Sequence, residues 1–185
     1  MYSKRQKITN IKRNELTDLE KEFVSAFAQG KKRATEMLKS GEPLLKAIEY
    51  VLDNLEYGAC YARKCRFFKI INYPGLSVDY KYLFLKDIFK DRFDQYKFRS
   101  IMKVFTKDDR FDLSFDDNFL LMRAVSEYVT YHVESINYLI NNERVKQKIL
   151  ESEQFNCLNF LPMAVKIENK EFYNGVMEKY PDKMI

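Results

Sequence analysis

Apolar side chains recur at helical spacing near the start of the chain. Four of them follow one another at intervals of three and four residues, which places them on one helical face: Leu16, Leu19, Phe23 and Phe27. Asn14 or Thr17 can cap the start of this helix, and Gly30 marks its end. A break at residues 41–43 follows, and its proline suits the first turn of a new helix.

A similar apolar run then recurs along the rest of the chain. It keeps the same order of apolar and polar positions in four places: residues 44–48, 83–88, 120–125 and 160–165. A second run occurs three times, each 34 residues after the last: residues 68–71, 102–105 and 136–139. Each unit therefore predicts a helix, a turn, a helix and a loop. A period of 34–40 residues is typical of helical-repeat solenoids, whose units bury their apolar faces by stacking.

These patterns predict an all-α protein, an irregular array of helical hairpins with an N-terminal helical cap. We assign residues 1–13 to a basic flexible arm, residues 14–42 to the cap and residues 43–185 to about four repeats within one domain. Only 5 glycines and 4 prolines in 185 residues favour long helices over a turn-rich β-fold. A plain helical bundle is the alternative. The predicted core comprises Leu45, Ile48, Phe84, Ile88, Leu121, Val125, Ile136, Leu139, Leu161 and Val165.

The third unit resembles a known family. Residues 117–124, Asp-Asn-Phe-Leu-Leu-Met-Arg-Ala, are similar to the first-helix run of divergent ankyrin repeats in large DNA viruses. Residues 132–140 resemble the second-helix run of those repeats, residues 142–145 resemble their Asp-x-Arg-Val loop, and residues 110–114 resemble their Arg-Val-Asp-Pro-Ser. Tyr131 stands where the family has glycine. The resemblance implies an irregular ankyrin-like array whose usual work is protein binding, and it implies no catalytic residue.

Positive charge gathers in the first half of the chain. Residues 1–100 contain 21 Lys and Arg against 13 Asp and Glu, whereas residues 101–185 contain 11 against 14. This asymmetry favours an acidic partner, and solvated helix faces are the structural alternative. The function we expect is non-enzymatic: a virus- or phage-encoded protein that binds a host protein with an acidic surface and redirects or inhibits it.

Five residues are the candidate contacts for such a partner: Arg63, Lys64, Arg66, Arg110 and Phe111. The first three form a basic run, which a second run at residues 31–33 can extend. The last two lie in a predicted loop on the concave face of the array, where arginine and aromatic side chains suit an interface. Phe111 can alternatively tuck into the stack. Basic residues beside aromatics also suit phosphates and bases, so a nucleic-acid-associated protein is the second hypothesis.

His132 is the only histidine, and we expect it to be structural, bonding backbone groups at the start of the second helix of its unit. With Cys60, Cys65 and Cys157 it would complete the ligand count of a zinc site. The C-x4-C spacing lacks a zinc knuckle, however, so we expect buried thiols and no metal.

Two other motifs can suggest ion chemistry. Asp108, Asp109, Asp112, Asp116 and Asp117 form an acidic stretch that lacks the order of an EF-hand loop, so turns and helix caps explain it better. Glu168-Asn169-Lys170 has the E-x-K form seen in metal-dependent nucleases, but the segment lies in a helical pattern rather than a strand. A small nuclease is therefore the third hypothesis. We expect no cofactor and no small-molecule substrate.

The N-terminal sequence has no apolar signal region, and no apolar run approaches the ~20 residues that a membrane span needs. Three cysteines, an odd number, favour free thiols in a reducing compartment. We therefore expect a cytoplasmic protein that does not associate with membranes.

Overall fold

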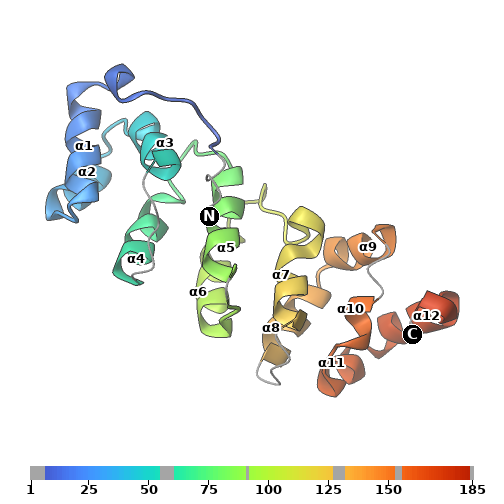
Figure 1. The fold of residues 1–185 in the computed structure, drawn as a ribbon. Helices are drawn as coiled ribbons and strands as arrows, with labels where there is room; N and C mark the ends of the chain where they lie inside the picture. The colour runs from blue at the N-terminus through green and yellow to red at the C-terminus, as the bar shows by residue number, and fades with distance from the viewer. Residues whose placement is uncertain (1–6, 55–60, 91, 127–131, 153–155, 184–185) are drawn as a thin grey trace, which may run out of the picture. The chain divides into compact units, whose positions relative to one another are not determined.

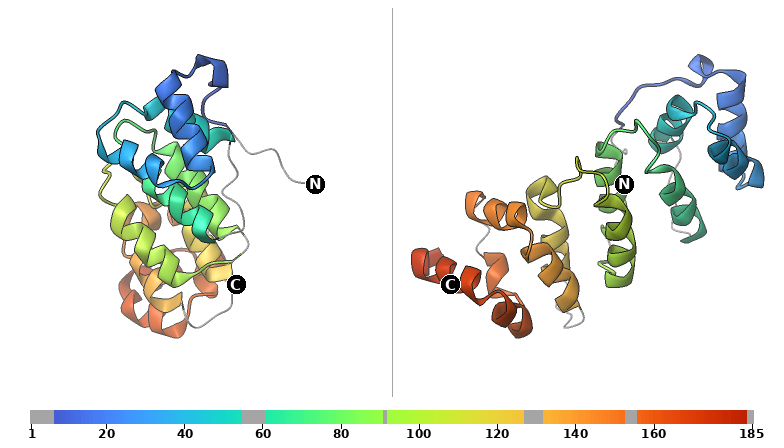
Figure 2. Two further views of the ribbon diagram at one scale, coloured as in Figure 1. Left: turned by 90° about the vertical axis from the view of Figure 1, so that its left-hand side faces the viewer. Right: turned by 180° about the vertical axis from the view of Figure 1, so that it is seen from behind.

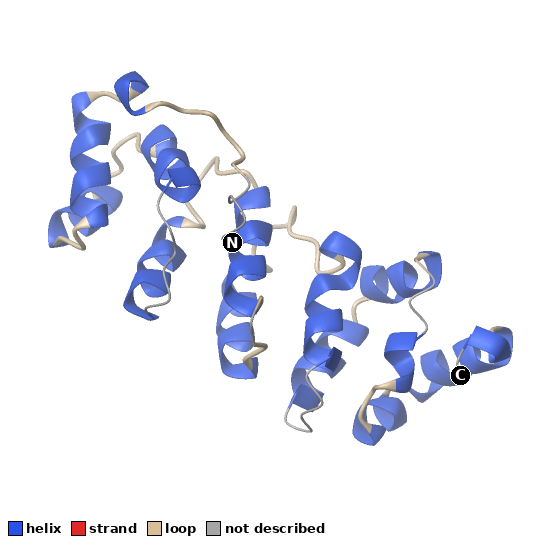
Figure 3. Ribbon diagram, viewed as in Figure 1, coloured by secondary structure: helices blue, strands red, loops and turns tan. Residues whose placement is uncertain are grey.

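The computed structural model describes residues 7–54, 61–90, 92–126, 132–152 and 156–183. The structure is 71% helix, and the described residues contain no strand (Figure 3). The prediction of an all-α protein is thus confirmed. The chain divides into two compact units, residues 1–83 and 84–185, and α5 runs across the boundary between them.

The first unit contains short helices joined by turns (Figure 1). Its elements are η1 (Arg13–Glu15), α1 (Asp18–Ala28), α2 (Lys32–Lys39), α3 (Leu45–Asn54), α4 (Tyr61–Ile70) and the start of α5 (Asp79–Phe89). Within it, α1 packs against α2 and α3. An edge-to-face contact between Phe27 of α1 and Phe67 of α4, with ring centroids 5.4 Å apart, joins α4 to the same core.

The residues at the two ends of α1 explain where this helix begins and ends. The Thr17 hydroxyl accepts a hydrogen bond from the Glu20 N–H, and the Glu20 carboxylate accepts one from the Thr17 N–H, which completes a capping box. At the other end, Gly30 has a φ of +68°, and the Lys31 N–H donates to the Ala26 carbonyl. This is a Schellman end, in which glycine accepts the left-handed conformation at little cost.

Residues 7–9 of the predicted basic arm lie against the end of α3. Residues 7–9 donate hydrogen bonds to Asp53 and Asn54 at the end of α3, and further along the segment Lys46 of α3 donates to the Glu15 carbonyl. The segment therefore follows α3 in the opposite direction. One buried carboxylate in α3, that of Asp53, accepts hydrogen bonds from the backbone of this segment.

The second unit is centred on α8. Its elements are α6 (Gln95–Phe105), α7 (Phe115–Ser126), α8 (Val133–Ile140), α9 (Glu143–Glu151), α10 (Asn156–Asn159), α11 (Met163–Glu168), α12 (Lys170–Lys179) and η3 (Pro181–Lys183), after the end of α5. Helix α8 packs against α6, α7, α9 and α11. Both views in Figure 2 show α7 and α8 side by side as a helical pair.

Most of the predicted core lies inside. Eight of the ten predicted side chains are buried: Ile48, Phe84, Leu121, Val125, Ile136, Leu139, Leu161 and Val165. Leu45 and Ile88 are only half-buried, and their neighbours Leu44 and Phe89 are fully buried instead. Adjacent apolar residues on a helix differ by about 100° in direction, so an apolar run alone leaves two candidates for the inward position.

One predicted loop is a helix. We expected residues 142–145 to form the loop that follows the third hairpin, as the resemblance implies, but α9 begins at Glu143. The side-chain oxygen of Asn142 accepts a hydrogen bond from the Val145 N–H, 3.3 Å away, and caps this helix. Val145 and Ile149 of α9 are completely buried, so the chain folds back onto α7 and α8 here.

Truncation of the core should test this packing directly. We expect Leu121→Ala and Leu139→Ala each to lower the free energy of unfolding by about 2–5 kcal/mol, because both side chains are completely buried. Leu150→Ala, at a residue of α9 that is 40% exposed, is the matched control and should cost far less. Urea denaturation measures all three. Losses below ~1 kcal/mol at both core positions would contradict the packing.

Candidate functional site

The structure places Arg66, from one basic run, beside the start of another basic run in the first unit. The Nη1 atom of Arg66, on α4, donates a hydrogen bond to the Phe27 carbonyl at the end of α1, 3.1 Å away. Its guanidinium lies so close over Gly30 that a Cβ atom there would stand 2.6 Å from Nη1. Residues 31–33 follow directly, and all three are exposed. We call Lys31, Lys32, Arg33 and Arg66 the basic corner.

Carboxylates lie among these cations. Arg33 Nε is 2.7 Å from Glu22 Oε1, and this bond and its charge raise the pKa of the Arg33 guanidinium. Lys32 Nζ is 3.7 Å from Glu36 Oε1, one helical turn away. The basic corner is therefore a mixed surface in which positive groups predominate, rather than a continuous positive track.

The three basic residues predicted on α4 have different outcomes. Arg66 lies in the basic corner, although its guanidinium also satisfies a backbone carbonyl at a helix end, which the sequence did not reveal. Arg63 and Lys64 lie in the first turn of α4, but their side chains are outside the described part of the structure. Their contact with a partner stays a prediction.

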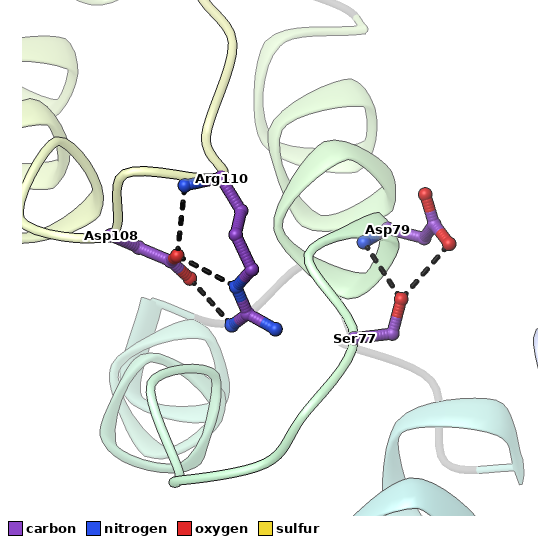
Figure 4. Close-up of polar contacts among 4 residues, drawn as sticks. All are labelled: Ser77, Asp79, Asp108 and Arg110. Carbon is purple, nitrogen blue, oxygen red and sulfur yellow. Dashed lines mark hydrogen bonds and ion pairs between the residues drawn. The ribbon is translucent and has the colours of Figure 1, made fainter.

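Arg110 and Phe111 occupy very different environments. Arg110 is exposed and binds Asp108 through both Nε and Nη2, each 2.8 Å from a carboxylate oxygen (Figure 4). The pKa of Arg110 is raised by this hydrogen bond and by the charge of Asp108. Phe111 is buried, with its ring packed edge-on against Phe105 at 5.6 Å. The structural alternative thus holds for Phe111, which is a core residue.

A polar groove that the sequence did not predict lies in the second unit. It has a volume of about 530 Å³ and is open to solvent. Its lining comes from the start of α7 and one face of α9: Asp112, Ser114, Phe115, Asp116, Asp117, Arg144, Gln147, Lys148 and Glu151. Three aspartates of the acidic stretch therefore gather in one place.

Each of these aspartates meets a cation or a donor. Asp116 lies 2.7 Å from the Lys86 ammonium, and Asp117 lies 3.2 Å from that of Lys148. Asp112 accepts hydrogen bonds from the N–H and hydroxyl of Ser114 and so closes a turn, as the sequence predicted for this residue. Two of the carboxylates in the groove are therefore paired with lysine ammonium groups.

The backbone beside the groove is unusual. Asp116, Asp117 and Asn118 have φ angles of 50°, 53° and 60°, three left-handed residues in succession. Asp and Asn tolerate this conformation better than other residues that carry a Cβ atom. Asn118 is completely buried, and its amide donates to the Val145 carbonyl of α9. The Asp-Asp-Asn triplet was the one sequence signal for this left-handed turn, but the same triplet also fits an ordinary helix cap.

His132 lies buried at the start of α8. It is 8% exposed and its ring packs edge-on against Phe93, with centroids 5.0 Å apart. It stands at the N-cap position of α8 but makes no side-chain cap hydrogen bond there. The expectation that the imidazole bonds backbone groups near this helix start stays a prediction.

The E-x-K segment serves helix packing. Glu168 ends α11 and accepts a short hydrogen bond from the Asn137 amide of α8. Asn169 then donates from Nδ2 to Asn137 Oδ1, 3.0 Å away, and to the Val165 carbonyl. No group of three or more His, Cys, Asp or Glu side chains within the described ranges is placed to hold a metal ion. The side chains of Cys60, Cys65 and Cys157 are outside what the structure describes.

Comparison with protein families, with curated proteins and with solved structures finds no match. Among the helices that the structure describes, none combines the length and apolar character that crossing a membrane requires.

A glycine pair can test the basic corner. Gly30→Ala should destabilise the protein by more than ~1 kcal/mol, because alanine resists the left-handed conformation and its Cβ displaces the Arg66 guanidinium. Gly41→Ala is the matched control, since Gly41 has a φ of +77° but no atom within 4 Å of the added Cβ. Thermal unfolding compares the two. An equal loss at both positions would show that Arg66 does not lie over Gly30.

Glu49 should make stability depend on pH. Burial and the neighbouring charge of Asp53 raise the pKa of Glu49. The folded state therefore holds this proton more tightly than the unfolded state, and stability falls as the pH rises through the raised value. We expect Glu49→Gln to raise the melting temperature at pH 7 and to have little effect near pH 4. The gain stays below ~1 kcal/mol because the carboxylate is partly solvated. A larger gain at pH 4 than at pH 7 would contradict this assignment.

Proposed function

We propose that the chain is an ankyrin-like array of helical hairpins that works as a non-enzymatic protein-interaction module. In this proposal it is encoded by a virus or phage and binds a host protein in order to redirect or inhibit it. The successive hairpins support the repeat arrangement: first helices begin at Leu45, Asp79 and Phe115. The two runs that resemble divergent ankyrin repeats fall in α7 and α8, a packed pair.

The basic corner is the observation that carries the binding proposal. Arg66 of α4 lies against the end of α1, directly before the basic residues 31–33, which are far from it in sequence. The exposed cations there attract an acidic surface, and arginine side chains form directional bonds with its carboxylates. Arg63 and Lys64, in the turn of α4 before Arg66, extend the same surface in this proposal.

A protein partner fits this surface better than nucleic acid does. Binding of a phosphate backbone is favoured by an unbroken positive track, which releases counterions from many phosphates at once. Glu22 and Glu36 interrupt the basic corner and would face such a backbone unfavourably. A protein surface that carries both signs of charge can match both the cations and the carboxylates.

Arg110 remains part of the proposed interface and Phe111 does not. The two bonds from Asp108 fix the direction of the exposed Arg110 guanidinium, so little side-chain entropy is lost when a partner binds it. Phe111 is already inside the second unit and offers no surface. The proposal assigns no reaction, cofactor or small-molecule substrate to the chain.

Charge reversal should test the proposed function. The partner is first captured from host-cell lysate and identified, and its binding to the purified chain is measured by a biosensor. We expect the double change Arg63→Glu and Lys64→Glu to slow association by about tenfold at low salt without changing the melting temperature. Arg110→Ala should instead speed dissociation. Lys103→Glu with Lys107→Glu, on exposed residues of the second unit, is the matched control and should do neither.

Two results would count against the proposal. One is an unchanged affinity in all the site variants while they remain folded. The other is tight binding to a mixed-sequence nucleic acid that weakens steeply with salt and is lost on the Arg63 and Lys64 change. That second result would instead support the nucleic-acid hypothesis.

A further inference from the structure

One buried carboxylate holds the N-terminal segment onto α3. The Ile8 N–H donates to Asp53 Oδ1 at 3.0 Å, and the Thr9 N–H donates to Asp53 Oδ2 at 2.8 Å. The Thr9 hydroxyl donates to the same Oδ2 atom at 2.6 Å. Beside them, Lys7 Nζ lies 2.6 Å from the side-chain oxygen of Asn54. Three donors from two consecutive residues therefore converge on Asp53.

Residues 7–12, which we call the strap, include the two residues that donate to Asp53. Ile8 and Ile11 are half-buried, Asn10 and Lys12 are exposed, and the strap forms neither helix nor strand. It is the dark blue segment that leaves η1 in Figure 1. Asp53 is 4% exposed while the strap is closed, so in this state its carboxylate depends on protein donors rather than on water. A buried carboxylate accepts hydrogen-bond donors readily but strongly disfavours a second negative charge.

We propose that the strap is releasable and that Thr9 is a phosphorylation site whose modification opens it. A protein kinase would transfer the γ-phosphoryl group of ATP to Thr9 Oγ1. An oxygen–phosphorus bond forms, ADP leaves, and the hydroxyl proton passes to the base of the kinase. The product has lost the O–H that donates to Asp53, and it carries a charge of about −1.5 to −2 at neutral pH. Phosphothreonine and the Asp53 carboxylate therefore repel each other where a hydrogen bond joined them.

The sequence around Thr9 suits this chemistry. Lys4, Arg5 and Lys7 precede Thr9, and kinases discriminate among substrates by such charge patterns. Thr9 is half-buried in the closed strap, so the kinase acts on the open form and the phosphate then prevents closure. This switch is independent of the proposed binding function, because it concerns only the strap and α3.

Hydrogen exchange of the full chain tests the switch. In the unmodified protein the amides of Ile8 and Thr9 should be protected, because both donate to Asp53. Thr9→Glu should speed their exchange by at least about tenfold, and trypsin should then cut faster after Lys12 and Arg13. Thr9→Ser keeps the hydroxyl and should stay protected. Asn10→Glu adds the same charge at the exposed neighbouring residue and should also stay protected.

Enzymatic phosphorylation completes the experiment. A kinase that prefers basic residues before its acceptor is first shown to phosphorylate a peptide of residues 1–15. The full chain is then treated with the same kinase and ATP, and mass spectrometry locates the phosphate. Phosphate on Thr9 together with fast exchange at residues 8 and 9 supports the proposal. Unchanged protection in Thr9→Glu, equal opening in Asn10→Glu, or a full chain left unmodified at Thr9 would overturn it.

Discussion

Satisfying the ends of short helices is the constraint on which this structure depends. A helix leaves its first four N–H and last four C=O groups without internal partners, so a helix of about 8 residues has as many unsatisfied groups as satisfied ones, and one of about 12 residues has half as many. Side chains from other elements supply what is missing. Arg66 donates to the end of α1, and Arg123 Nε donates to the Phe89 carbonyl at the end of α5, 2.9 Å away. The Tyr73 hydroxyl bridges the Glu42 carbonyl and the Leu44 N–H before α3.

The same requirement explains what the sequence predicted and what it did not. Local patterns gave the all-α class, the Thr17 cap, the Gly30 end and most of the core, because each depends on neighbours within about one helical turn. The roles of Arg66 and Asn118 depend on carbonyl groups contributed by distant residues, which no local pattern reveals. Helix α9 was missed because residues 142–145, its cap and first three residues, also fitted a loop.

For the candidate surfaces, too, local sequence showed some features and only the fold shows the others. Composition correctly pointed to basic residues in the first half, but only the fold joins residues 31–33 to Arg66. Phe111 was misplaced because a Phe beside an exposed Arg has the same sequence signature whether it faces solvent or the core. The polar groove could not be predicted, since Asp116 and Asp117 need a left-handed turn to meet α9.

The double role of Arg66 has a consequence for any ligand of the basic corner. A partner that draws the guanidinium toward itself must take it from the Phe27 carbonyl, so recognition and the integrity of α1 compete for one side chain. The coupling between the two equilibria is reciprocal. A change that stabilises the end of α1 lowers the affinity for such a partner, and binding of the partner destabilises the end of α1 by the same free energy. The same coupling free energy therefore enters both the affinity of the basic corner for a partner and the local stability of α1.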